Sequence, residues 1–250
     1  MFLVVLFMLP CETNALSDSE RINWFFKSKG DNTRPKILEG CNIDLGNSLY
    51  IGNEGDKRVY LTFDAGYSNE NLESILDSLK KHNANAAFFI LPGIIKNSPD
   101  VVKRMARDGH LVCNHTTSHC DMSRLTNIDS FEKEMRGIEE QYRALTGMDL
   151  EKYIRPPEGA FSVKCLEFCE QLGYTPVFWS FAYADWDNGK QPDTEKAKAK
   201  IFNNIHDGMV LLLHPTSRTN ALIMDDLLTE LSARGYSFGT LDELAEQQTR

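Results

Sequence analysis

The sequence of 250 residues contains no run of basic residues, and its 27 Lys and Arg are outnumbered by 36 Asp and Glu. A net charge of −9 without a positive stripe excludes the electrostatic footprint of a nucleic-acid-binding protein or of a protein held on anionic lipid by charge. Long apolar runs are also absent, since the longest, FLVVLFML at residues 2–9, is too short to cross a bilayer. We therefore expect no nucleic-acid partner and no stable insertion into a membrane.

Cysteine is scarce, with six residues and no C-x-x-C pair. Cys165 and Cys169 lie one helical turn apart, a spacing that rarely makes an unstrained disulfide. These features exclude a disulfide scaffold, and we interpret the cysteines mostly as buried thiols. The G-x-S-x-G elbow, the H-E-x-x-H helix and the glycine-rich phosphate loop are missing as well, which excludes the classes of enzyme that those motifs mark.

The apolar run at residues 2–9 has the length of the hydrophobic region of a secretory signal. Thr13 and Ala15 follow it at the positions of a small-residue cleavage motif, although no basic segment precedes the run. A frayed apolar N-terminus is the alternative interpretation. We expect residues 1–15 to be a signal peptide and the protein to be exported.

Strand and helix patterns alternate from residue 56 to the C-terminus. Strands are expected at 59–63, 86–90, 111–113, near 153, at 177–179, 209–213 and after 237, and helices at 69–81, 99–107, 129–146, 163–172, 194–205, 221–233 and up to 246. Gly109, Gly147, Gly173 and Gly235 each follow an expected helix, where a left-handed cap is needed. Buried strands separated by helices favour parallel pairing, so seven such units predict an α/β protein with a closed or nearly closed (β/α) barrel.

The organisation of the chain follows from the same pattern. No low-complexity linker interrupts residues 56–250, which we expect to form one domain. Residues 16–55 are polar and rich in Gly and Asn, and they include the aromatic cluster Trp24-Phe25-Phe26. We expect this segment to be an irregular lead-in that packs on the barrel.

Polar groups follow the ends of five expected strands. They are Asp64, Asn114-His115, Arg155, Asp185-Trp186 and His214. The carboxyl ends of barrel strands form the face on which the chemistry of such proteins occurs. We therefore expect these groups to meet in one site.

Two histidines lie four residues apart in NHTTSH, residues 114–119. On a helical turn, His115 and His119 would face the same way and could share a divalent cation. Two unrelated surface histidines are the alternative. The position of the motif just after a buried strand favours a metal site.

The remaining strand-end residues suit acid–base chemistry. His214 closes the apolar run MVLLLH, and the carboxylates Asp185 and Asp64 end other strands, as a tuned acid–base pair requires. Arg155, before two prolines, is a natural partner to keep Asp64 ionised. A satisfied core histidine and a structural ion pair are the alternatives for His214 and Arg155.

In this order, the motifs TFDAG, HTTSH, RPPEG, the DW of YADWD and LLLHP resemble those of the NodB-type polysaccharide deacetylases. INWFFKSKG, FWSFAYADWDNGKQP and HPTSRTNA resemble one subgroup, the δ-lactam-biosynthetic de-N-acetylases, which act on muramic residues of spore-cortex peptidoglycan. The resemblance extends from Trp24 to the C-terminus. It implies a distorted (β/α)7 barrel, the NodB homology domain, and metal-assisted hydrolysis of the N-acetyl group of an amino sugar.

The resemblance also implies a catalytic role for four residues. Asp64 matches the general base that deprotonates the attacking water, and Arg155 matches the residue that steadies this base. His214 matches the acid that protonates the departing nitrogen, and Asp185 matches the partner that orients and charges it. One well-placed acid or base accelerates such a reaction about 10²–10⁴-fold.

Five further residues match the metal and substrate positions of the family. His115 and His119 match the ligands of one divalent metal ion, which we expect to be zinc. Trp186 matches the aromatic wall of the substrate groove. Pro157 and Glu158, in RPPEG, are expected to contact substrate, although many relatives carry an aromatic residue in place of Glu158.

Ala65 departs from the family pattern, because most members carry a second Asp there as the third metal ligand. Alanine cannot coordinate, so the full charge of the cation would remain uncompensated by the two neutral imidazoles. We expect this to weaken metal retention, to strengthen polarisation of the substrate, and to leave the third position to water. Cys113 is a less favoured substitute, because thiols in strands are usually packed.

These expectations lead to one function and two alternatives. The favoured function is an exported, monomeric deacetylase of N-acetylmuramic acid that acts on peptidoglycan glycan strands in δ-lactam formation, in the cell wall or spore-cortex compartment. The enzymatic alternative is a deacetylase of N-acetylglucosamine or chitin-type oligosaccharides. The alternative of another class, suggested by Ala65, is a metal-deficient glycan-binding pseudoenzyme.

Overall fold

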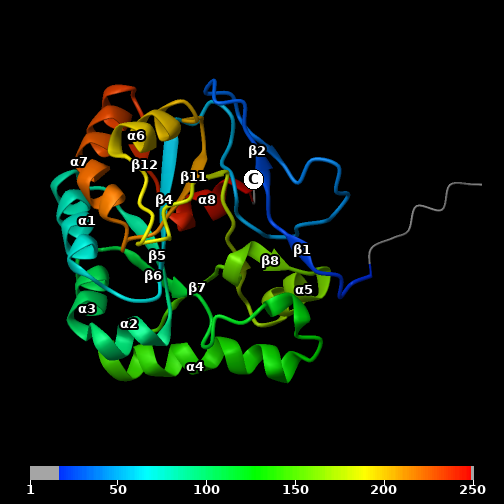
Figure 1. The fold of residues 1–250 in the computed structure, drawn as a ribbon. Coiled ribbons are helices and arrows are strands. Elements are labelled where there is room, and N and C mark those ends of the chain that lie inside the picture. Colours follow the sequence, from blue (N-terminus) through cyan, green and yellow to red (C-terminus); the bar gives the residue numbers. More distant parts are fainter. Residues whose placement is uncertain (1–16, 249–250) are drawn as a thin grey trace, which may run out of the picture.

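The computed structural model describes residues 17–248 of the protein (Figure 1). The expected signal peptide, residues 1–15, lies outside the described residues. Within residues 17–248, no helix combines the length and the apolar character that crossing a bilayer requires.

One parallel sheet of eight strands forms the centre of the molecule. Seven strands follow one another in the order β10-β11-β4-β5-β6-β7-β9, and β12 pairs with β4 beside them. The strands are β4 Arg58–Ala65, β5 Ala86–Ile90, β6 Leu111–Asn114, β7 Glu151–Ile154, β9 Thr175–Pro176, β10 Phe181–Ala182, β11 Met209–Leu213 and β12 Ser237–Phe238. All seven pairings along the path and beside it are parallel. The sheet curls into a half-barrel, which confirms the distorted (β/α)7 barrel.

Helices cover the outer face of this sheet. They are α1 Glu70–Lys81, α2 Pro92–Asn97, α3 Pro99–Arg107, α4 Ile128–Thr146, α5 Val163–Gln171, α6 Thr194–Phe202 and α7 Arg218–Ala233. The last helix, α8 Leu241–Gln248, instead places Leu241 and Leu244 in the same apolar cluster as Tyr60 of β4. Figure 1 shows α1, α3 and α7 along one side of the sheet and α4 across the bottom. The expected helix ends are confirmed: Gly109, Gly147, Gly173 and Gly235 all have positive φ, between 71° and 85°.

Alternation along β4 divides the core into an outer and an inner layer. Val59 and Phe63 belong to the apolar cluster between the sheet and the helices, whereas Tyr60 belongs to the cluster inside the barrel. Successive side chains of a strand point to opposite faces. Asp64 therefore faces the barrel interior, and Ala65, fully buried in the outer cluster, faces the helices.

Two expectations about the elements need correction. Helix α2 was not expected, because its six residues carry too short a pattern to show a helical period. The strand expected at 177–179 ends earlier, as β9, and only Val177 continues with an isolated bridge to Leu49. Residues 178–180 instead cross towards β11, where the amide of Ser180 donates to the carbonyl of Val210 at 3.0 Å.

The lead-in is more regular than expected, since it contains three strands of two residues. β1 Ile22–Asn23 pairs antiparallel with β8 Ala160–Phe161, and β2 Phe26–Lys27 pairs antiparallel with β3 Lys36–Ile37. Two residues are too few for any period to appear in the sequence. Further along, the amide of Leu49 donates to Pro176 at 2.8 Å, and the amide of Gly52 donates to Gly208 at 2.7 Å. The lead-in therefore fills the opening between β9 and β11.

Trp24 anchors the lead-in to the rim of the barrel. Its ring stacks on Phe178 with centroids 4.2 Å apart, and its indole N–H donates to the carbonyl of Trp179 at 2.8 Å. Its amide donates to the carbonyl of Gly159 at 2.9 Å. Gly159 has φ of 66°, and a Cβ on it would lie 2.6 Å from the Trp179 ring, so this close approach requires glycine.

Replacing Trp24 by Ala tests whether the lead-in is part of the core. We expect the free energy of unfolding to fall by about 3–5 kcal/mol, because a buried indole and its hydrogen bond are lost. Urea denaturation measures this. Leu222→Ala is the control, since this α7 side chain is 62% exposed and should change stability by no more than about 0.5 kcal/mol. A loss as small as that of the control would mean that the lead-in packs only superficially.

Candidate active site

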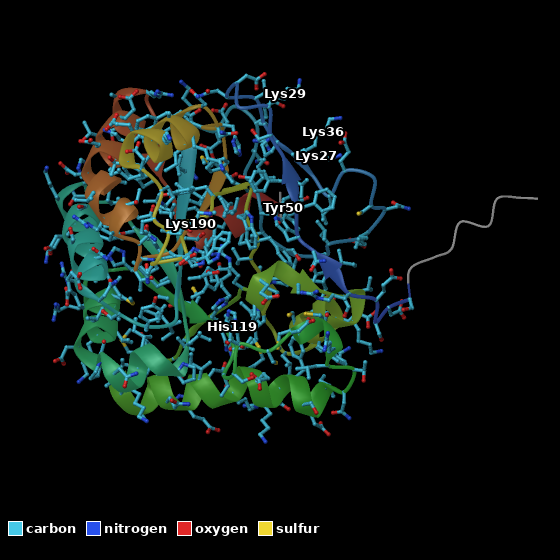
Figure 2. All side chains as sticks on the ribbon, viewed as in Figure 1. Lys27, Lys29, Lys36, Tyr50, His119 and Lys190 are labelled. Carbon is cyan, nitrogen blue, oxygen red and sulfur yellow. The ribbon has the colours of Figure 1, made fainter. Side chains whose placement is uncertain are left out.

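The sheet brings the five strand-end groups to one edge, around a cavity of about 700 Å³. Asp64 lies near the end of β4, and the others follow β6, β7, β10 and β11. The cavity is lined by Asp64, Gly66, Tyr67, Leu91, His115, His119, Glu158, Trp179, Ala182, Tyr183, Trp186, Leu212, His214 and Thr216. Figure 2 shows the His119 side chain near the centre of the molecule, above α4.

Asp64 is paired with a fully buried guanidinium. Arg155 Nη1 donates to Asp64 Oδ1 at 2.8 Å, and Nη2 donates to Thr62 Oγ1 at 2.9 Å. The guanidinium also lies 4.3 Å from the centroid of the Phe89 ring, and Nε donates to the carbonyl of Val177 at 3.1 Å. Burial by itself would raise the pKa of Asp64, but the charge and hydrogen bond of Arg155, together with the charges of His115 and His214, outweigh it and lower this pKa below 3.8. The carboxylate is therefore ionised at neutral pH.

His115 is held as a neutral imidazole. Its Nδ1 donates to the backbone carbonyl of Arg155 at 2.8 Å, so Nε2 carries the free lone pair. Burial lowers the pKa of His115 to about 4, although Asp64 opposes this shift. Nε2 lies 3.6 Å from Asp64 Oδ2. Because the lone pair of His115 Nε2 and the charge of Asp64 Oδ2 lie this close together, a cation bound beside them would be stabilised.

His119 reaches the same place, but not along a helical turn as the spacing suggested. Residues 115–119 are irregular, and both Thr116 and His119 have positive φ, 72° and 56°. The amide of His119 donates to Thr116 Oγ1 at 3.0 Å, which closes the loop. The ring centroids of His115 and His119 are 5.0 Å apart. The structure therefore brings the two imidazoles together, as the sequence predicts, but the predicted helical turn is wrong.

Asp185 holds His214, which lines the same cavity. Its Oδ1 lies 2.7 Å from His214 Nδ1, and its Oδ2 accepts from the His214 amide at 2.8 Å. Burial lowers the pKa of His214, but the hydrogen bond and charge of Asp185 outweigh it and raise the pKa above 6.5. The pair therefore stabilises the folded state fully below pH 6.5, and this contribution is lost as the pH rises through the raised pKa.

Asn220, which is not among the expected site residues, supports this pair. Its side-chain amide donates to Asp185 Oδ2 at 2.6 Å and to the backbone carbonyl of His214 at 3.0 Å. Asn220 lies in the first turn of α7 and is fully buried. It belongs to HPTSRTNA, so the subgroup resemblance was the one signal that could have identified it.

The rim of the cavity agrees with the expectations in part. Trp186 is 61% exposed, and its ring centroid lies 6.2 Å from that of His214. Glu158 lines the cavity, with its side chain 70% exposed. Pro157, in contrast, is buried and does not line the cavity. It begins a 3-10 turn in which the positive φ of Glu158, 59°, turns the chain, so the expected contact of Pro157 with substrate is not supported.

The imidazole pair fits a divalent cation in its donor chemistry. Ligand histidines commonly donate their other ring N–H to a backbone carbonyl, as His115 does. Within residues 17–248, no third His, Cys, Asp or Glu is grouped with these two imidazoles in a way suited to a metal. Ala65 faces the helices, and burial raises the pKa of the Cys113 thiol, which disfavours the thiolate that a metal binds.

Comparison with known proteins places the chain in a family. The family model described as polysaccharide deacetylase matches residues 51–177. The chain belongs to this family, which confirms that it is an enzyme of the deacetylase class. Peptidoglycan-N-acetylmuramic acid deacetylase PdaA of Bacillus subtilis is 37% identical over 228 residues, 90% of this chain and 86% of that protein.

Solved structures agree. The structure of Bacillus subtilis PdaA, described as a family 4 carbohydrate esterase, superposes with a TM-score of 0.87 at 36% identity, covering 92% of this chain and 99% of that one. A Bacillus anthracis protein described as a family 4 pseudoenzyme is also similar, with a TM-score of 0.73, 26% identity, and coverage of 84% of this chain and 72% of that one.

Replacing Asp185 by Asn should lower the pKa of His214. The charge of Asp185, which raises this pKa, is removed while the burial that lowers it remains, so we expect the pKa of His214 to fall even though the charge of Asp64 is still present. A pH titration of the imidazole followed by NMR measures the change. Asp187→Asn, at an exposed carboxylate two residues away, is the control. Equal His214 titrations in wild type and Asp185→Asn would refute the assignment of Asp185 as the charging partner.

Proposed function

We propose that this protein hydrolyses the N-acetyl group of muramic acid residues in peptidoglycan, in formation of the muramic δ-lactam of the spore cortex. The observation that carries the proposal is one cavity in which an ionised Asp64, a protonatable His214 and two imidazoles lie together, in a chain similar to PdaA over 90% of its length. The proposal includes export of the protein, since its substrate lies outside the cytoplasm, and action as a monomer.

An amide resists hydrolysis because its carbonyl is a poor electrophile and its nitrogen a poor leaving group. Asp64, kept ionised by Arg155, accepts a proton from the attacking water. The imidazolium of His214 donates its Nε2 proton to the amide nitrogen as the C–N bond breaks, while Asp185 holds Nδ1. Acetic acid and a free amine form, and the acid leaves as acetate after losing its proton to solvent. Transfer of the proton from Asp64 back to His214 through solvent restores both groups.

His115 and His119 would hold the divalent cation, zinc in our proposal, which when bound polarises the acetyl carbonyl and lowers the pKa of water. His115 contributes a neutral ring with a fixed tautomer, so no proton has to leave before binding at neutral pH. Trp186 and Glu158 form part of the rim on which the sugar chain would lie.

Two alternatives are tested by the same experiments. N-Acetylglucosamine or chitin-type oligosaccharides would need the same base and acid, so they differ from muramic acid only in how the rim binds the substituent on the sugar. A glycan-binding pseudoenzyme is disfavoured because the base, the acid and their partners are in hydrogen-bond contact with each other.

The substrate prediction is that purified protein releases acetate from peptide-free glycan strands that contain N-acetylmuramic acid. A chelator should abolish the release and added zinc should restore it, which a coupled acetate assay can follow. Chitin oligomers are the comparison substrate. Release from chitin alone would replace the muramic assignment by the glucosamine alternative, and release unaffected by chelator would remove the metal from the proposal.

The catalytic prediction concerns the base. Asp64→Asn should lower kcat by about 10²–10⁴-fold, because the amide cannot accept the proton of water. Glycan binding, measured by calorimetry, should persist. Asp44→Asn, at an exposed lead-in carboxylate, should leave kcat unchanged. Loss of glycan binding together with activity would show that Asp64 binds substrate and is not the base.

A further inference from the structure

The segment that carries both imidazoles has a backbone that needs support. We call residues 115–119 the histidine loop. Two of its five residues have positive φ, and neither is glycine: Thr116 at 72° and His119 at 56°. A β-branched residue such as threonine rarely adopts this conformation, which persists only where the surroundings impose it. The contacts of the loop therefore decide whether the two rings stay 5.0 Å apart.

Those contacts come largely from one residue of α4. Glu134 Oε2 accepts from the amides of Ser118 and Thr117, at 2.8 and 3.2 Å, and Oε1 accepts from Ser118 Oγ at 2.9 Å. The backbone carbonyl of Glu134 accepts from Thr117 Oγ1 at 2.7 Å. One helical residue thus binds the middle of the histidine loop through four hydrogen bonds, between the two imidazoles in the sequence.

Helix α4 also has a glycine, Gly137, where it lies against the histidine loop, three residues after Glu134. A Cβ on Gly137 would lie 2.5 Å from Thr117 Oγ1, so only glycine permits the loop to lie this close to the helix. The other end of the loop is fixed from β6, where Asn114 Oδ1 accepts from the amide of Thr116 at 2.7 Å. Asn114 is itself held from α4, because its Nδ2 donates to the carbonyl of Met135 at 3.0 Å.

We propose that Glu134 is a positioning residue that fixes the distance between the His115 and His119 rings and thereby sets the affinity of the site for a divalent cation. The proposal rests on the metal site of the proposed function. Glu134 lies in the loop-facing side of α4, and all of the hydrogen bonds described above for its carboxylate go to the loop. A carboxylate suits this position because it is an acceptor only, and three donors converge on it.

The test is zinc binding by the full chain, measured as a dissociation constant by competition with a chelator. Glu134→Ala should weaken binding by about 10–100-fold, the effect typical of losing a residue that orients a ligand. Glu134→Gln keeps an acceptor for the backbone amides, so most of the affinity should return. Glu140→Ala is the matched control, because this residue is exposed on the same helix.

Hydrogen exchange separates positioning from general stability. In Glu134→Ala the amides of Thr117 and Ser118 should exchange faster, while the amides in the core strands keep their protection. Ser118→Ala removes only the hydroxyl donor of an exposed residue, so it should give a smaller loss of zinc affinity. This variant can replace Glu134→Ala as the test if Glu134→Ala does not fold. The Ser118 and Glu134 effects should not add.

Zinc affinity within twofold of wild type in both Glu134→Ala and Ser118→Ala would overturn the proposal, as would equal losses in Glu134→Gln and Glu134→Ala. None of these measurements uses a glycan. If zinc-loaded wild-type protein releases no acetate from muramic strands while Glu134→Ala still weakens zinc binding, the proposed function is refuted and the role of Glu134 stands.

Discussion

The arrangement of the site depends on one buried cation, the guanidinium of Arg155. A charge taken out of water costs several kcal/mol unless partners surround it, and here the partners are Asp64, Thr62 and the carbonyls of residues 177 and 178. The side chain of Arg155 helps to keep Asp64 ionised, while its backbone carbonyl fixes the tautomer of His115. The same residue thus prepares two different groups of the cavity, and it joins β4, β6 and the segment after β9 in doing so.

Two histidines of identical chemistry acquire opposite properties in this cavity. His115 is buried beside a carbonyl, and burial lowers its pKa to about 4. The pKa of His214 rises above 6.5, because a carboxylate on Nδ1 outweighs burial. At neutral pH the neutral ring of His115 can therefore donate an electron pair, whereas the ring of His214 can be protonated and donate a proton. Two groups of the same kind can take different roles in acid–base chemistry only when their environments move their pKa values apart, as happens here.

The sequence predicts the site well wherever a strand ends. Asp64, His115 and His214 follow apolar runs whose length and direction are visible, and a parallel sheet then brings their ends together. It fails where contacts between distant segments decide. The chain leaves the expected strand 177–179 after Val177, which bridges to Leu49, and the histidine loop is irregular where α4 holds it. Asn220 lies one residue before the helix that the sequence predicts at 221–233, so it was not placed on the buried face of that helix. Pro157 is a similar case, since only the turn after β7 shows that this residue is buried.

The lead-in has a consequence for the solubility of shortened forms of the chain. The family model begins at residue 51, but the amide and carbonyl of Leu49 complete the hydrogen bonds of Pro176 and Phe178. A fragment cut at that boundary would present these groups, together with the apolar surface beneath Trp24, as an unprotected sheet edge. Open edges of this kind pair with other copies and aggregate. Residues 17–50, which precede the region that the family model matches, thus cover this edge and protect the domain against self-association.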